Sequence, residues 1–306
     1  MEMLAYSPDV ASPAHDIAIG GALSAAAVKH KRQGPGRWQF ALANGAVIPG
    51  EIRLSDGWLT MTATLSDQPI SCSHKAWSLL ECNAALPTGV RFALGRSRIA
   101  VMRMEHPVMD RPMDGAPALA DDVQEGIRGF RTAGHFFGWA GSDGVEYESP
   151  PLMPHEPSTQ ALAQVCADTG WIHHAREDGR LMVDLESGGD FVQASGVAGV
   201  DEVALSVVLL SADWQLPVVC RGAMAAFLLA EADQVRMCRP YAIRNRGAVD
   251  LGAQVRVSGA PCGSWAPHAL AALSIFCSRT LREMPLLSNE EIARAYLDAR
   301  GFQRNW

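Results

Sequence analysis

The chain has 306 residues, of which 48% are hydrophobic and 19% charged, and this composition is typical of folded globular proteins. The length allows two domains of ordinary size, each with its own hydrophobic core. The formal net charge is −7, so the overall basic surface that nucleic-acid-binding proteins use is not expected.

An apolar stretch near the N-terminus, residues 17–28, resembles the hydrophobic region of a secretory signal peptide in composition only. Residues 1–16 contain no Lys or Arg, and the positive charges follow the stretch, which reverses the signal-peptide pattern. The stretch is also shorter than a bilayer span. We therefore predict a domain helix over about 13–32, with Ser12 as its N-cap and a Gly-Pro-Gly sequence ending it.

The rest of the first half predicts strands and helices in a regular order. Leu59, Met61 and Ala63 alternate with polar residues or Trp, as in a half-buried strand, and Asp56-Gly57 before them is typical of a hairpin turn. The predicted elements are strands at 37–43, 47–54 and 58–65, a helix at 73–86, strands at 90–94 and 98–105, and an amphipathic helix from about 116 to 130.

The second half predicts the same order again. Asp178-Gly179 is its hairpin turn, and the glycine-rich stretch 188–199 is interpreted as a long loop. The predicted elements are a helix at 158–168, strands at 171–177, 180–186 and 202–210, a helix at 218–232, strands at 235–244 and 249–257, and helices from Ala266 and from Ser288.

The two halves indicate a tandem duplication. The predicted fold class is α+β, with two helix-βββ-helix-ββ-helix modules whose antiparallel sheets carry helices on one side, arranged as a pseudo-dimer. Trp38 and Trp171 open corresponding strands, and Val90-Arg91 corresponds to Val235-Arg236. The predicted modules are residues 1–137 and 158–306, joined by a linker at 138–157 that is rich in Pro, Gly and acidic residues.

No catalytic, cofactor-binding or metal-binding signature is found, and the sequence predicts none of these sites. GxGxxG, GxxxxGK[ST], HExxH and GxSxG are all absent. His173 and His174 would point to opposite faces of a strand and cannot chelate one metal together. The spacing of His30, Cys72 and His74 does not suggest zinc either.

The cysteines are dispersed and odd in number, so we interpret them as reduced, buried thiols, although a Cys–His dyad formed by the fold stays open. They are Cys72, Cys82, Cys166, Cys220, Cys238, Cys262 and Cys277.

Several charged and aromatic residues are given structural interpretations. The carboxylates of Asp121-Asp122 and Glu290-Glu291 suit helix N-terminal ends. Arg91 and Arg236 are interpreted as solvated surface residues. Five tryptophans in apolar-patterned segments are assigned to the core: Trp38, Trp58, Trp77, Trp171 and Trp214.

The predicted element order resembles the fold of type III secretion chaperones, which the YbjN-type sensory regulators share. The residues that carry this resemblance are Trp77–Asn83, Val90–Leu94 and Ile99–Glu105 in the first half, with a looser match at Phe227–Asp233. The resemblance implies a small, acidic, cytoplasmic protein that binds an extended segment of a partner protein by strand addition and in hydrophobic grooves.

We therefore expect a non-enzymatic protein-binding module resembling a secretion chaperone, without cofactors. Its expected partner is a protein, with no nucleic acid and no membrane, and the chain is expected to be a monomer with internal pseudo-two-fold symmetry. The alternatives are an enzyme with a site between the two modules and a regulator of the YbjN type.

Overall fold

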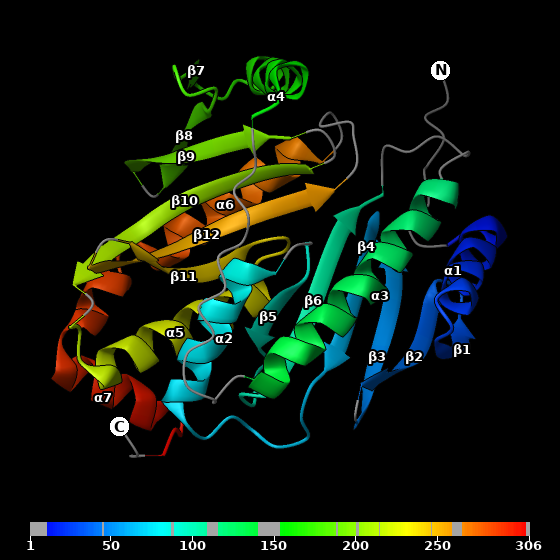
Figure 1. Ribbon diagram of the computed structural model, residues 1–306, viewed down its shortest axis with the longest axis horizontal. Helices are drawn as coiled ribbons and strands as arrows, with labels where there is room; N and C mark the ends of the chain where they lie inside the picture. The colour runs from blue at the N-terminus through cyan, green and yellow to red at the C-terminus, as the bar shows by residue number, and fades with distance from the viewer. Residues whose placement is uncertain are drawn as a thin grey trace, which may run out of the picture.

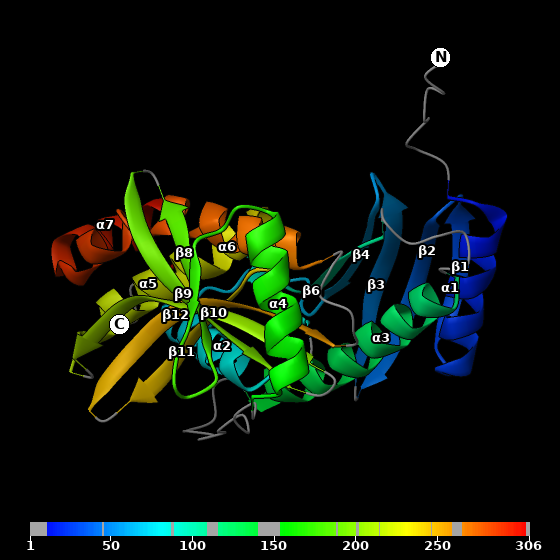
Figure 2. The same cartoon turned by 90° about the horizontal axis from the view of Figure 1, so that it is seen from above.

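The computed structural model describes residues 11–44, 46–86, 89–108, 116–139, 154–187, 189–199, 202–213, 215–245, 247–258 and 265–303. It is a mixed α+β protein with two antiparallel sheets, and Figures 1 and 2 show the two modules side by side. The first module consists of α1 (Pro13–Ala25), β1 (Lys29–Gly34), β2 (Arg37–Asn44), β3 (Ala46–Ser55), β4 (Trp58–Thr64), α2 (Ser73–Ala85), β5 (Arg91–Leu94), β6 (Ala100–Pro107) and α3 (Ala116–Trp139).

The second module repeats this order and adds two elements at its end. It consists of α4 (Glu156–Asp168), β7 (His173–Ala175), β8 (Leu181–Ser187), β9 (Asp190–Ala198), β10 (Glu202–Asp213), α5 (Val218–Gln234), β11 (Arg239–Asn245), β12 (Ala248–Ser258), α6 (Ala266–Thr280), the 3₁₀-helix η2 (Met284–Ser288) and α7 (Glu290–Ala299). The expected linker falls largely on residues outside the described ranges.

The two sheets have the same strand order, which confirms the predicted tandem α+β architecture. The order is β1-β2-β3-β4-β6-β5 in the first module and β7-β8-β9-β10-β12-β11 in the second. In both, a meander of four antiparallel strands is followed by a helix and a hairpin. The second strand of the hairpin pairs with the fourth strand of the meander, and its first strand forms the edge of the sheet. Each module therefore has four strands before its central helix, one more than predicted.

The additional strands lie where the sequence predicts other structure. The first helix ends at Ala25 and not near residue 32, because Ala27 adopts a left-handed conformation with φ of 52°. The following residues then form β1, which pairs with β2. In the second module β9 occupies the stretch interpreted as a loop.

Several local predictions are confirmed. The N–H of His15 donates to Ser12 Oγ at 3.3 Å, which caps α1. Asp56 and Gly57 both have positive φ, as a tight hairpin turn between β3 and β4 requires. In β4, Leu59, Met61 and Ala63 are fully buried and alternate with half-buried residues.

The central helices pack across the boundary between the modules. Helix α2 packs against α5 and against β11 of the second module, and α5 packs against β5 of the first module. Figure 1 shows α2 and α5 next to each other, with α5 below the sheet of the second module. Each edge strand at the boundary is thus covered by the other module's central helix, so the modules share one continuous core.

Among the described helices, none has the length and hydrophobicity needed to cross a membrane.

Candidate functional site between the modules

A pocket of about 280 Å³ opens at the boundary, where the β5–β6 turn of the first module meets α5, α7 and the C-terminal segment of the second. This volume is near the lower end of the range for small-molecule sites. Its lining combines apolar side chains with cations: Pro69, Leu94, Gly95, Arg96, Ser97, Arg98, Ala226, Ala230, Tyr296, Arg300 and Phe302.

The β5–β6 turn holds the arginines of the first module in place. Backbone hydrogen bonds close the turn, from Gly95 N to Ile99 O and from Arg98 N to Gly95 O, both at 2.9 Å. Arg98 has a φ of 60°, and its Nη1 donates to Ile70 O at 2.9 Å. This leaves Arg96 and Ser97 exposed at the tip of the turn.

The C-terminal segment after α7 forms another wall of the pocket. Gly301 has a φ of 76°, the left-handed conformation that ends a helix, and directs Phe302 into a buried position. The guanidinium of Arg98 lies 5.3 Å from the ring centroid of Phe302. Gln303 N donates to Ser71 O at 2.8 Å, so this segment of the second module is bonded to the first.

Tyr296 and Arg300 line the pocket from α7. The Tyr296 ring packs edge-on against Phe227 at 6.1 Å, and the Arg300 guanidinium lies 5.5 Å from its centroid. The Tyr296 hydroxyl is buried, and no described residue accepts its proton, although Arg300 donates to its oxygen. Burial raises the pKa of Tyr296, while the positive charge of Arg300 acts in the opposite direction. The phenol is therefore protonated at neutral pH.

The pocket has a strongly positive character. Arg96, Arg98 and Arg300 line it, and no carboxylate is among the lining residues that the structure describes. Glu231, whose charge contributes to the raised pKa of Tyr296, forms an ion pair with Arg279. The arrangement can therefore attract an anion, with apolar side chains to contact the rest of the molecule.

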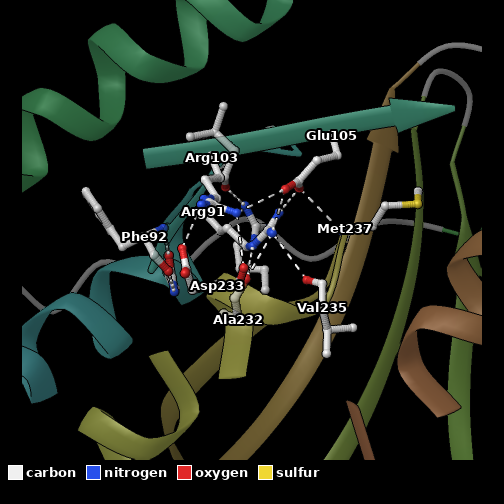
Figure 3. A network of polar contacts seen from close by, with 11 residues as sticks. Arg91, Phe92, Arg103, Glu105, Ala232, Asp233, Val235 and Met237 are labelled. Atoms are coloured by element: carbon white, nitrogen blue, oxygen red, sulfur yellow. Dashed lines mark hydrogen bonds and ion pairs between the residues drawn. The ribbon is translucent and has the colours of Figure 1, made fainter. Parts of the chain in front are cut away.

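A buried ionic network joins the two modules, as Figure 3 shows. Arg91, at the start of β5, is completely buried and forms an ion pair with Glu105 of β6. It also donates to Ala232 O from Nη2 at 3.0 Å and to Val235 O at 3.2 Å. These carbonyls lie at the C-terminal end of α5, where helix carbonyls lack intrahelical partners and favour a cation.

A second ion pair borders the same network. Arg103 of β6 pairs with Asp233 at 2.9 Å, and its Nη1 donates to Asp233 O at 3.0 Å. The interpretation of Arg91 as a solvated residue is therefore wrong. Its side chain extends from the first module to the C-terminal end of α5 in the second module. Arg236, its expected counterpart, instead lies over Trp58, with its guanidinium 4.8 Å from the ring centroid.

The structural counterpart of Arg91 is Arg239, which opens β11. It is almost completely buried and donates to Val90 O at 3.1 Å. In the amide orientation that satisfies both groups, the Gln254 oxygen accepts from Nε and Nη2 of Arg239 at 3.2 Å. Burial lowers the pKa of Arg239 to about 9, and the nearby charge of Arg256 acts in the same direction.

The carboxylates noted in the sequence have separate environments. Helix α3 begins at Ala116 and has no acidic residue in its first turn, so the helix-end interpretation of Asp121 and Asp122 is not confirmed. Asp121 is exposed, whereas Asp122 is nearly buried and lies 3.5 Å from Nδ1 of His106. Near this pair, a cavity of about 10 Å³ lined by Glu105, His106 and other residues has room for about one water molecule. Glu290 and Glu291 lie in the first turn of α7, as predicted.

The contacts and burial of the histidine doublet and the tryptophans are as follows. The Nδ1 of His173 lies 3.0 Å from Trp171 O, while His174 is exposed. Trp38 and Trp77 are buried, Trp58 and Trp171 are half-buried, and Cys262 and Trp214 lie outside the described residues. Within the described part of the chain, no group of three or more His, Cys, Asp or Glu side chains could hold a metal ion.

The sequence does not predict the pocket. Its residues come from segments more than 200 positions apart, and none of them belongs to a recognisable motif. The one signal in the sequence is the pair of arginines at a hairpin turn, Arg96 and Arg98, which alone does not distinguish a binding site from a solvated turn.

No protein-family model matches the chain, and no curated protein matches it either. Among solved structures, it is similar to the di-domain ARO/CYC protein StfQ from the steffimycin biosynthetic pathway, with 13% identity, 95% of this chain and 97% of that chain covered, and a TM-score of 0.15. It is also similar to DynU16, from the dynemicin biosynthetic locus, with 9% identity, 94% and 97% covered, and a TM-score of 0.15. Likenesses at this TM-score do not assign an activity to this chain.

These findings correct the function expected from the sequence, a secretion-chaperone-like module that binds an extended protein segment. Both similar structures come from biosynthetic pathways, and neither is a secretion chaperone. The sheet edges give the physical reason. Strand β1 is rich in Lys and Arg, which discourages strand addition, and β7 has only three residues. The other two edges, β5 and β11, lie at the boundary between the modules.

Proposed function

We propose that this chain binds a small organic anion in the pocket between its two modules. The observation that carries the proposal is the set of three arginines, Arg96, Arg98 and Arg300, around a partly apolar cavity whose described lining residues include no carboxylate. A carboxylate or phosphate group pairs well with guanidinium groups, and the apolar side chains would contact the carbon skeleton of the ligand.

The position of the pocket supports the same conclusion. Both modules contribute walls, so the site exists only when the two are assembled. Arg98 is fixed by Ile70 O and by Phe302, whereas Arg96 and Arg300 are exposed to solvent and Arg300 packs on Tyr296. This location agrees with the alternative that the sequence left open, an enzyme site between the modules.

Binding is tested by calorimetric titration with 4-phenylbutanoate and with its neutral amide. We expect the acid to bind and the amide to bind at least several-fold more weakly. The substitutions Arg96→Gln and Arg300→Gln should each weaken binding of the acid by about three- to tenfold, because each removes one partly screened charge. Arg294→Gln is the matched control: it lies on the same helix, pairs with Glu290 and does not line the pocket.

Equal binding of the acid and the amide, or equal effects of Arg294→Gln and Arg300→Gln, would contradict the proposal. Raising the salt concentration should weaken binding of the acid and leave any binding of the amide unchanged.

Catalysis on the bound anion is the second candidate function. It is favoured by the protonated phenol of Tyr296 beside Arg300, because such a group can donate a proton to an oxyanion that develops in a reaction. Incubation of the protein with each ligand that binds, followed by mass spectrometry of the ligand, distinguishes turnover from binding alone.

A further inference from the structure

We infer that the anion bound in this pocket also carries a carbonyl group, which accepts the proton of Tyr296. The inference rests on the function proposed above and narrows the class of ligand to oxo-carboxylates and related carbonyl-bearing anions. Tyr296 then acts as a specificity-determining residue.

The first step concerns the proton of the phenol. The Tyr296 hydroxyl is buried, and no described residue accepts its proton. Arg300 lies next to it and donates to the phenol oxygen, but a guanidinium group only donates and cannot accept this proton. Burial raises the pKa of Tyr296, so the proton is retained. The pocket thus offers a donor for which the described residues provide no acceptor.

The second step concerns the charge of the matching acceptor. Arg96 and Arg300 are exposed, whereas the hydroxyl of Tyr296 is buried. Moving an ionised carboxylate away from water costs far more free energy than moving a carbonyl. The anionic group of the ligand therefore stays with the exposed guanidinium groups, and an uncharged acceptor reaches the buried hydroxyl.

The third step concerns discrimination between ligands. A pocket with a buried donor favours the ligand that satisfies it over an analogue without the acceptor, because the analogue leaves the donor unpaired. Arg300 strengthens this preference, since a cation beside the phenol makes its proton a better donor. The preference should disappear when the hydroxyl is removed.

The test uses three probes with one carbon skeleton: 4-phenylbutanoate, 2-oxo-4-phenylbutanoate and 4-oxo-4-phenylbutanoate. Their affinities are measured by calorimetry for the full-length protein and for Tyr296→Phe. We expect at least one oxo-acid to bind the unmodified protein about three- to tenfold more tightly than the parent acid, the effect of one neutral hydrogen bond. Tyr296→Phe should abolish this preference, so that the three probes bind the variant with affinities within about twofold of one another.

Tyr241→Phe serves as the control, because it removes a buried hydroxyl that donates to Val207 O and lies outside the pocket. It should not change the preference. If the parent acid binds and neither oxo-acid binds more tightly, the inference is overturned while the proposed function stands. If Tyr296→Phe weakens all three probes equally, the hydroxyl binds the carboxylate and the inference is again overturned. If none of the probes binds, the proposed function fails together with it.

Discussion

Arg91 and Arg239 are buried arginines at corresponding positions of the two modules, and each bonds to the backbone of the other module. Their environments differ because the strand beside each carries different residues. Arg91 has the carboxylate of Glu105, whereas Arg239 has the amide of Gln254 and the positive charge of Arg256 nearby. The duplicated fold therefore preserves the position of the arginine but not the group that neutralises it.

We expect the ion pair of Arg91 and Glu105 to be sensitive to the loss of either partner. Arg91→Met leaves a buried carboxylate without its cation, and Glu105→Leu leaves a buried guanidinium without its anion. Each should lower the free energy of unfolding by about 3–5 kcal/mol, and the double substitution should cost less than the sum. Urea denaturation measures these values.

The control for this prediction is the exposed pair of Arg53 and Glu51, which lies 2.7 Å apart on β3. Arg53→Met should cost about 1 kcal/mol or less, because water already solvates both groups. Equal costs for Arg53→Met and Arg91→Met would show that burial of the Arg91 pair does not matter.

Cys277, which is buried, and Cys82, which is half-buried, are expected to be unreactive in the folded protein. Burial raises the pKa values of Cys82 and Cys277 to about 12, so at pH 8 roughly one thiol in 10⁴ is ionised. Because only the thiolate attacks alkylating reagents, iodoacetamide should leave both residues unmodified at pH 8 and modify them after denaturation in urea. Peptide mass spectrometry measures the modification, and rapid labelling of either residue in the folded protein would contradict the prediction.

Among the helices and strands, the sequence predicts those with a regular alternation of apolar and polar residues or with a recognisable capping or turn residue. Strand β4 and its Asp-Gly turn are examples, because burial of one face imposes the alternation. Strand β1 was missed because it is an edge strand with no buried residue, and its pairing with β2 is a tertiary contact. Strand β9 was missed because the glycines of the stretch 188–199 suggest a loop; at Gly196 a Cβ atom would lie 2.8 Å from the Leu162 side chain, so the strand packs closely there.

The candidate site could not be predicted in the same way. Its geometry depends on the packing of α7 and the C-terminal segment against the first module, which no local pattern encodes. Arg91 illustrates the same limit, since its partners on α5 lie about 140 residues away in the chain.

Helix α7 positions Tyr296 and Arg300, so its N-cap should matter for stability and for the pocket. The side chain of Asn289 accepts from Glu291 N at 2.9 Å and from Ile292 N at 3.3 Å. Asn289→Ala should lower the free energy of unfolding by about 1 kcal/mol and speed amide exchange in α7. Asn289→Ser keeps a capping oxygen and should have a smaller effect; equal effects of the two substitutions would argue against the cap.

In the whole molecule, the central helix of each module packs against an edge strand of the other module. Helix α2 packs on β11 and α5 packs on β5, so neither module covers its own edge strand alone. The core is continuous, and the carbonyls at the end of α5 are bonded to Arg91 of the other module. We propose that the expected modules, residues 1–137 and 158–306, are halves of one folding unit joined by the segment 138–157.

This proposal predicts one cooperative unfolding transition for the intact chain, with calorimetric and van't Hoff enthalpies that agree. Each half expressed alone should expose the apolar face of its central helix and should self-associate or aggregate. Mixed together, the halves should form a one-to-one complex, because each supplies the surface that the other lacks. Differential scanning calorimetry and analytical ultracentrifugation measure these outcomes. Two independent transitions, or a stable monomeric half that unfolds cooperatively, would show that the modules fold separately. The buried arginines would then only hold together two domains that are already folded.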